Sequence, residues 1–168
     1  HAAAQRLLEA DHILILSHQP PAGDTLGCAS ALLRGLRQLG KQAGFRCSDA
    51  VPKKFEYLFA GLEEQASSPV FVVSVDIADQ QLFGAGLAEY LERVDLCIDH
   101  HGTNSRFAKE CYVEPGAAAA CEIVFLLLQE MKVEITPEIA DCLFTGLCTD
   151  TGCFRYGNVT PRTHRMAA

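Results

Sequence analysis

Three short apolar segments, each ended by side chains of the kind that bind metal ions, constrain the fold of this chain more than any other feature. They are His12–Ser17, Val70–Val75 and Val94–Ile98. Nearly continuous apolar runs of this length are typical of parallel strands whose sheet is covered on both faces. Because helical segments alternate with them, the sequence predicts an α/β fold with an open, mostly parallel β-sheet and helices on both faces.

Helical segments are indicated by the spacing of apolar residues and by terminal signals. Thr25–Leu39 carries an apolar stripe at helical spacing, closed by Gly40. Thr136-Pro137 offers an N-cap residue and a proline at the first helical position, so another helix is predicted to begin there. The other predicted elements are a strand at Lys41–Cys47, a short helix near Lys53–Phe59, a loop at Ser67–Pro69 and a long helix that follows Gly116 and runs to about Met131.

Length and hydropathy indicate one domain without a membrane span. A chain of 168 residues is long enough to bury one core. Its longest apolar stretch, Ala117–Leu128, is interrupted by Glu122 and is shorter than the roughly 20 residues that a span needs. The first residue is not Met, and Thr160-Pro161 begins a helix close to the last residue. We therefore expect residues 1–168 to be one domain and a fragment of a longer, two-domain protein.

The spacing of the cysteines indicates a cellular compartment, and the net charge limits the kinds of binding partner. None of the eight cysteines forms a Cys-x-x-Cys pair, and most lie in apolar segments. This pattern indicates buried free thiols in a reducing cytoplasm and argues against a zinc–thiolate site. A formal net charge of −7 argues against a surface that coats long nucleic acid, because such a surface needs a basic stripe. It does not exclude a small phosphorylated substrate.

Imidazole and carboxylate side chains follow the predicted strands. In open parallel sheets, ligands bind beyond the carboxyl ends of the strands, so these side chains are expected to meet in one cleft. Such ligands suit manganese, iron, zinc or magnesium, and manganese is favoured where carboxylates outnumber histidines. For Asp76 or Asp99 alone, a helix cap or a turn residue is the simpler explanation. The candidate residues are His18, Asp24, Asp76, Asp99, His100, His101 and Asp150.

Six motifs occur in order along residues 5–168. They are Ser-His-x-x-Pro-x-Gly-Asp-x-x-Gly (17–27), Val-Asp-x-Ala-Asp (75–79), Ile-Asp-His-His-x-x-Asn-x-x-Phe (98–107), Glu-Pro-x-Ala-Ala-Ala (114–119), Thr-Gly-Leu-x-Thr-Asp-Thr-Gly-x-Phe-Arg-Tyr (145–156) and Asn-x-Thr-Pro-x-Thr-His-Arg (158–165). Together they resemble the DHH phosphoesterases, which include RecJ-type exonucleases, manganese-dependent inorganic pyrophosphatases and nanoRNase/phosphoadenosine phosphatases. The last two motifs are most similar to the nanoRNase branch, which cleaves very short oligonucleotides and dephosphorylates 3′-phosphoadenosine 5′-phosphate. Some relatives of that branch act on cyclic dinucleotides.

The resemblance implies a centre of two Mn2+ ions, with Mg2+ or another divalent metal as the alternative. His18 and Asp76 would hold one ion, and Asp24, Asp76, His100 and Asp150 would hold the other, so that Asp76 bridges the two. His101 would face the substrate phosphate as a hydrogen-bond donor or general acid. Asp99 would lie behind His100 or His101 and fix an imidazole tautomer.

Three further residues each have two interpretations. The resemblance makes Asn104 and Arg155 candidate contacts for a phosphate or nucleotide. A turn stabiliser and a surface salt-bridge residue are equally good explanations of the same two residues. Asp79 could support the loop of Asp76, but the more direct expectation is that it caps the following helix.

Ala22 departs from the family pattern. The first loop of the family reads His-x-x-Pro-Asp-Gly-Asp, whereas this chain has alanine at position 22, where a carboxylate ligand of the first metal is expected. A methyl group cannot coordinate, so that site keeps only His18 and Asp76. We expect the first site to bind metal weakly or not at all, and the second site to be retained. Ala22 is either a natural variation or an introduced substitution.

The function implied is metal-dependent, exoribonuclease-type hydrolysis of phosphodiester or phosphomonoester bonds, impaired in this form by Ala22. The substrates would be short oligoribonucleotides, linear or cyclic dinucleotides, or 3′-phosphoadenosine 5′-phosphate. Family members carry a C-terminal substrate-clamp domain, which is absent from residues 1–168, and whether the chain forms a homodimer is left open. The alternative is a catalytically inactive nucleotide- or metal-binding module of the same fold. A manganese-dependent pyrophosphatase is a less favoured third candidate.

Overall fold

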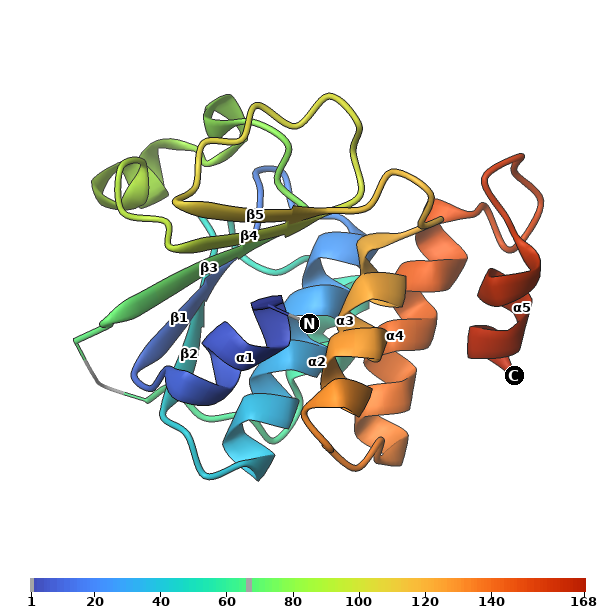
Figure 1. Ribbon diagram of the computed structural model, residues 1–168, viewed down its shortest axis with the longest axis horizontal. Helices are drawn as coiled ribbons and strands as arrows, with labels where there is room; N and C mark the ends of the chain where they lie inside the picture. The colour runs from blue at the N-terminus through green and yellow to red at the C-terminus, as the bar shows by residue number, and fades with distance from the viewer. Residues whose placement is uncertain (1, 66–67) are drawn as a thin grey trace.

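The computed structural model describes residues 2–65 and 68–168, and its centre is a five-stranded sheet in which all strands are parallel (Figure 1). In the order β2-β1-β3-β4-β5, the strands are β1 Ile13–Leu16, β2 Ala43–Arg46, β3 Phe71–Val75, β4 Leu96–Asp99 and β5 Glu110–Val113. The predicted open, parallel α/β sheet is confirmed. The sequence does not predict β5, because this edge strand is only partly buried and lacks a continuous apolar run.

Helices cover both faces of the sheet, but they differ between the faces. One face carries α1 Ala2–Glu9, α2 Gly23–Gln38, α3 Ala120–Glu130 and α4 Pro137–Asp150 (Figure 1). The other face carries the 3-10 helices η2 Gln80–Leu82 and η3 Ala85–Tyr90. Along β1, Ile13 and Ile15 join the core beneath the α-helices, whereas Leu14 and Leu16 pack on the opposite side. This alternation follows from the two-residue repeat of a strand, and both faces are apolar because both are buried.

The helix ends agree with the predicted signals except at α3. Thr136 caps α4 by accepting a hydrogen bond from the backbone N–H of Ile139, as predicted. The short helix η1 Lys53–Phe59 is a 3-10 helix, and α5 Pro161–Ala167 begins at the predicted Thr160-Pro161. Residues 116–119 remain outside α3, which starts only at Ala120. The predicted loop at Ser67–Pro69 lies partly outside the described residues.

Helices α2 and α4 approach closely, and this contact sets the position of two candidate ligands. A Cβ atom at Gly27 of α2 would lie 2.5 Å from the carbonyl oxygen of Cys142 in α4, so only glycine permits this spacing. Asp24 lies one turn before Gly27, and Asp150 is the last residue of α4. The glycine contact therefore brings the start of α2 next to the end of α4.

The cysteines agree only in part with the expectation of buried free thiols. All eight cysteines are free thiols, of which four are buried, three are half-buried and Cys153 is exposed. Within residues 2–65 and 68–168, no helix has the length and hydropathy required to cross a membrane.

Candidate metal centre

Strands β1, β3 and β4 end at the same edge of the sheet because of their register. Leu16 of β1 is level with Ser74 of β3, and Val75 of β3 is level with Ile98 of β4. The polar residues that follow each strand are therefore brought to one edge.

Asp76 lies between two of the histidines that follow these strands. Its Oδ2 is 3.6 Å from His18 Nε2, and its Oδ1 is 3.5 Å from His100 Nε2. Asp76 also has a φ of +58°, a conformation that non-glycine residues seldom adopt and that concentrates at functional sites. The two imidazoles thus meet at one buried carboxylate, as the candidate ligand set requires.

His100 faces two further carboxylates from the α-helical layer. Its Nε2 is 3.0 Å from Asp150 Oδ2 and 3.7 Å from Asp24 Oδ2. Its other ring nitrogen, Nδ1, is 3.1 Å from the carbonyl oxygen of Ala117. With Nδ1 donating its proton to this carbonyl, Nε2 is the ring nitrogen that is left to bind a metal ion or, without one, a proton.

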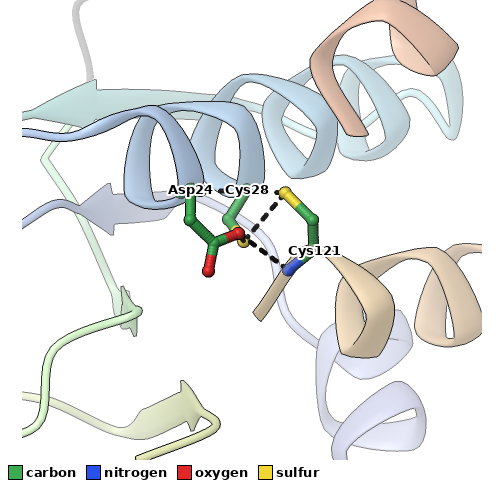
Figure 2. Close-up of side chains that lie close together, drawn as sticks. All are labelled: Asp24, Cys28 and Cys121. Carbon is green, nitrogen blue, oxygen red and sulfur yellow. Dashed lines mark hydrogen bonds between the residues drawn. The ribbon is translucent and has the colours of Figure 1, made fainter. Parts of the chain in front are cut away.

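Asp24 is fully buried and is held by the first turn of α3 (Figure 2). Its two oxygens accept hydrogen bonds from the backbone N–H groups of Ala120 at 2.7 Å and Cys121 at 3.0 Å. Ala119, the N-cap of α3, supplies no side-chain cap. The carboxylate of Asp24 therefore satisfies N–H groups that a helix leaves unpaired, which explains why α3 begins later than predicted.

Two thiols lie beside Asp24, which was not expected from the spacing of the cysteines. The Sγ atoms of Cys28 and Cys121 are 3.4 Å apart, and Cys28 Sγ is 3.6 Å from Asp24 Oδ1 (Figure 2). Burial raises the pKa of both thiols, so they are held as neutral donors next to the carboxylate. We interpret them as support for Asp24.

His101 is the most exposed imidazole of the cluster and is oriented by Asp99. Its Nδ1 is 2.7 Å from Asp99 Oδ1, and its side chain is 44% exposed. The second oxygen of Asp99 accepts a hydrogen bond from Asn104 Nδ2 at 2.8 Å. Of the two predicted positions for Asp99, behind His100 or behind His101, the structure shows the second. The hydrogen bond to Asp99 also raises the pKa of His101, which favours the protonated ring.

Asn104, Arg155 and Asp79 each have a local contact. Both polar atoms of the Asn104 amide have protein partners, because its Oδ1 accepts a hydrogen bond from the backbone N–H of Arg106 while its Nδ2 donates to Asp99 and to the carbonyl of Ile77. Arg155 is exposed, and its Nε donates to the carbonyl of Gly152 at 2.9 Å. Asp79 accepts a hydrogen bond from the N–H of Gln81 and caps η2, as expected.

The electrostatics of the cluster suit a bound cation. Burial, followed by the charges of Asp76 and Asp150, raises the pKa of Asp24 well above its usual value. Burial opposes a charge on His100, but the nearby carboxylates of Asp150 and Asp76 outweigh it and raise its pKa to about 11. Asp76 Oδ1 and His100 Nε2 are buried, and within the described part of the chain neither makes a hydrogen bond of good geometry, although charged groups lie 3.0 to 3.7 Å away. A divalent cation fits this donor set, because it would neutralise the carboxylates and bind both atoms.

The two halves of the cluster differ in their supply of ligand atoms. Asp24, His100 and Asp150 offer three atoms that all lie within 4.8 Å of one another, and so do Asp76, His100 and His101. Across the described ranges, His18 belongs to no such group. Ala22 is exposed at the N-cap of α2 and offers neither a ligand atom nor a side-chain cap. The half that contains His18 is therefore the poorer cation site.

Two supporting side chains could not be identified as such from the sequence. Glu122 is fully buried in α3, where it accepts hydrogen bonds from Arg162 at 3.0 Å and from the hydroxyl of Thr163 at 2.5 Å. Asn158 donates to the carbonyls of Ala118 and Asp150 at 3.1 and 3.0 Å. A single carboxylate inside an apolar run is the signal that could have pointed to Glu122. Asn158 opens the last of the six motifs, but the motif alone gave it no role.

Comparisons with known proteins agree with this geometry. The DHH family, N-terminal domain, matches residues 12–147. The chain is 38% identical over 164 residues to a bifunctional oligoribonuclease and PAP phosphatase, NrnA, of Thermus thermophilus, covering 93% of this chain and 48% of the relative. It is 28% identical to the cyclic-di-AMP phosphodiesterase GdpP of Geobacillus thermodenitrificans, covering 92% of this chain and 27% of that protein.

A solved structure supports the same fold. The exopolyphosphatase-related protein of Bacteroides fragilis superposes with a TM-score of 0.87 at 22% sequence identity, over 98% of this chain and 53% of that one. The chain thus spans about half the length, or less, of the relatives it matches. Because the family match extends over most of the sequence, this chain belongs to the DHH family as an example of its N-terminal domain.

Proposed function

We propose that this chain forms the metal centre of a divalent-metal-dependent phosphoesterase that acts on small nucleotide substrates. The observation that carries the proposal is the buried Asp76, which has an imidazole next to each of its two oxygens. The carboxylates of Asp24 and Asp150 also approach His100, and three carboxylates with two imidazoles suit a divalent cation. Such cations are the usual means of phosphoryl hydrolysis.

The substrate class is suggested by the relatives. NrnA of Thermus thermophilus is named for oligoribonuclease and PAP phosphatase activity, and GdpP for cyclic-di-AMP hydrolysis. The substrates we propose for this chain are short oligoribonucleotides, linear or cyclic dinucleotides, or 3′-phosphoadenosine 5′-phosphate. We propose further that the reaction takes place in the cytoplasm, and that the full-length protein adds a C-terminal domain that completes the grip on the substrate.

The residues of this chain divide into metal ligands and substrate-facing groups. Asp24, Asp76, His100 and Asp150 would hold one ion, and His18 with Asp76 would hold the other. Bound divalent ions supply Lewis-acid stabilisation of phosphate charge and lower the pKa of water. His101, which Asp99 orients and whose pKa Asp99 raises, would donate a hydrogen bond to a phosphate oxygen and a proton to the leaving oxygen.

Ala22 is expected to weaken the His18 site, since the family pattern places a carboxylate at this position. We therefore propose one tight Mn2+ equivalent and impaired turnover for this form, with Mg2+ or another divalent ion as a substitute. The alternative function, a nucleotide- or metal-binding module without activity, is favoured by the same alanine. Retention of every other candidate ligand in one cluster favours the enzyme.

The release of mononucleotide from a diadenosine dinucleotide, measured with Mn2+ and with a chelator, tests the proposal. We expect Mn2+-dependent release that is slow in this form and faster in the Ala22→Asp variant. Binding of the dinucleotide without turnover in both forms would establish the inactive module instead. Faster release of phosphate from pyrophosphate than of mononucleotide from the dinucleotide would establish the pyrophosphatase.

A further inference from the structure

A left-handed turn follows the metal centre directly. After Asp150 and Thr151, residues Gly152, Cys153 and Phe154 have φ values of +57°, +56° and +65°. Glycine adopts this conformation readily, but Cys153 and Phe154 do so at a cost, and such conformations persist only where the surroundings hold them. Backbone outliers of this kind concentrate at functional sites, so this turn is a candidate ligand-binding segment.

Thr151 holds the turn in place. Its side chain is fully buried, and its carbonyl accepts hydrogen bonds from the backbone N–H groups of both Arg155 and Tyr156 at 3.0 Å. Its hydroxyl oxygen accepts a third, from the N–H of Phe154 at 3.0 Å. The ring of Phe154 stacks on His164 of α5 at a centroid distance of 5.6 Å. The conformation is therefore fixed before any substrate binds.

The turn presents one aromatic ring and one guanidinium to solvent. A Cβ atom at Gly152 would lie 2.4 Å from the ring of Tyr156, so the ring rests directly on the glycine. Tyr156 nevertheless remains 59% exposed. Arg155 is exposed beside it, with its Nε held by the carbonyl of Gly152, and it forms no ion pair with any residue that the structure describes.

The turn is connected to the metal centre through Asn158. The amide of Asn158 donates to the carbonyl of Asp150 and to that of Ala118, which precedes the first turn of α3. Asp150 Oδ2 is itself 3.0 Å from His100 Nε2. The exposed ring and guanidinium therefore project from the segment that immediately follows a candidate metal ligand.

We infer that the ring of Tyr156 stacks on a nucleobase of the substrate and that, together with Arg155, which the family resemblance already makes a candidate phosphate contact, it forms a nucleotide-recognition platform. Aromatic side chains bind splayed bases of single-stranded nucleic acid by stacking, which tolerates every base because each has a π-face. A planar guanidinium matches the geometry of phosphate. The inference rests on the proposed function and deepens it, because it makes Tyr156 a determinant of preference for nucleotides over phosphoesters that lack a base.

The test compares two substrates in the full-length protein carrying Ala22→Asp. One is a 5′-phosphorylated dinucleotide, and the other is the same molecule without its bases. For Tyr156→Leu we expect KM for the dinucleotide to rise about tenfold or more with kcat little changed, as for loss of one base–aromatic stack. Hydrolysis of the base-free substrate should be unaffected, and Tyr156→Phe should behave as the parent because the ring is retained.

A matched control is Tyr57→Leu, which removes another exposed tyrosine, 52% accessible, on η1. It should leave KM for both substrates unchanged. Arg155→Gln should raise KM for the 5′-phosphorylated dinucleotide more than for its dephosphorylated form. Equal KM values for the parent and Tyr156→Leu, or an equal loss on the base-free substrate, would overturn the inference.

Failure of the proposed function is distinguishable from failure of the platform. If the parent hydrolyses neither substrate, the phosphoesterase proposal fails. The fluorescence anisotropy of a labelled dinucleotide, measured with Mn2+, then reports binding without turnover and tests the stacking by Tyr156 on its own. Weaker binding by Tyr156→Leu than by Tyr156→Phe supports stacking, and equal binding excludes it.

Discussion

Asp99 lies behind His101, with its Oδ1 2.7 Å from Nδ1 of the imidazole. The aspartate is fully buried, whereas the ring is partly exposed. Because the carboxylate occupies one ring nitrogen, the other remains available to a ligand from solvent. This arrangement gives His101 a fixed tautomer and a raised pKa, which are the properties of a proton donor.

Replacing Asp99 by Asn should reduce activity without emptying the metal centre. The substitution keeps the shape but removes the charge that raises the pKa of His101, so the basic limb of the pH–rate profile should move to lower pH. Loss of a partner that orients a site imidazole typically costs about 10- to 100-fold in activity. The profile of kcat against pH measures both effects. Asp79→Asn is the control, because Asp79 only caps η2 and should leave the profile unchanged.

Ala22→Asp should raise the number of tightly bound Mn2+ ions per chain from one to two, as measured by isothermal titration calorimetry. It should also raise turnover, and stabilise the fold by about 1 kcal/mol by capping α2, whose N-cap has no side-chain hydrogen bond. Ala22→Asn separates these effects, because an uncharged amide caps a helix equally well but is a poorer metal ligand. Two tight ions with Ala22 in place would refute the expected loss of the His18 site.

The stability of the metal-free protein should fall as pH rises. The pKa of His100 is raised from 6.5 to about 11 in the folded state, so its protonated ring stabilises the fold fully below the unfolded value. That contribution is lost as pH rises from 6.5 through 11. Urea unfolding in a chelator at several pH values above neutrality should show this slope.

Saturating Mn2+ should remove most of this pH dependence, because the ion takes the place of the proton. His100→Gln should reduce the slope, since the amide does not titrate, and leave the part that comes from the raised pKa of Asp24. An unchanged slope in His100→Gln would assign the whole effect to groups other than His100.

Gly27→Ala should destabilise the protein by about 1–3 kcal/mol, as overpacking in a core does. The added methyl would meet the carbonyl oxygen of Cys142 and force α2 away from α4. Gly116→Ala is the matched control, because a Cβ there meets nothing within 4 Å. Urea denaturation of both variants measures the difference. Equal stability of the two would show that α2 and α4 can separate without loss.

Much of the fold could be predicted from local patterns. The strands β1, β3 and β4 are continuous apolar runs ended by polar residues, and both properties are visible in consecutive letters of the sequence. The start of α4 depends on Thr136 and Pro137, which act within a single turn. Strand β5 was not predicted, because it lies at the edge of the sheet, is only partly buried and therefore has no continuous apolar run.

The sequence alone indicated the candidate ligands that follow β1, β3 and β4, because the ends of parallel strands meet wherever a sheet of this kind forms. Asp24 and Asp150 lie instead on α2 and α4, and helix packing brings them to the same place. The tertiary structure decided that Asp99 orients His101 rather than His100, that Asp24 caps α3, and that Glu122 is buried against Arg162. The spacing of these residues in the sequence gives no periodic signal, so no local pattern pairs them. They pair because side chains pack together and because buried polar groups need hydrogen-bond partners, and both conditions depend on the whole folded chain.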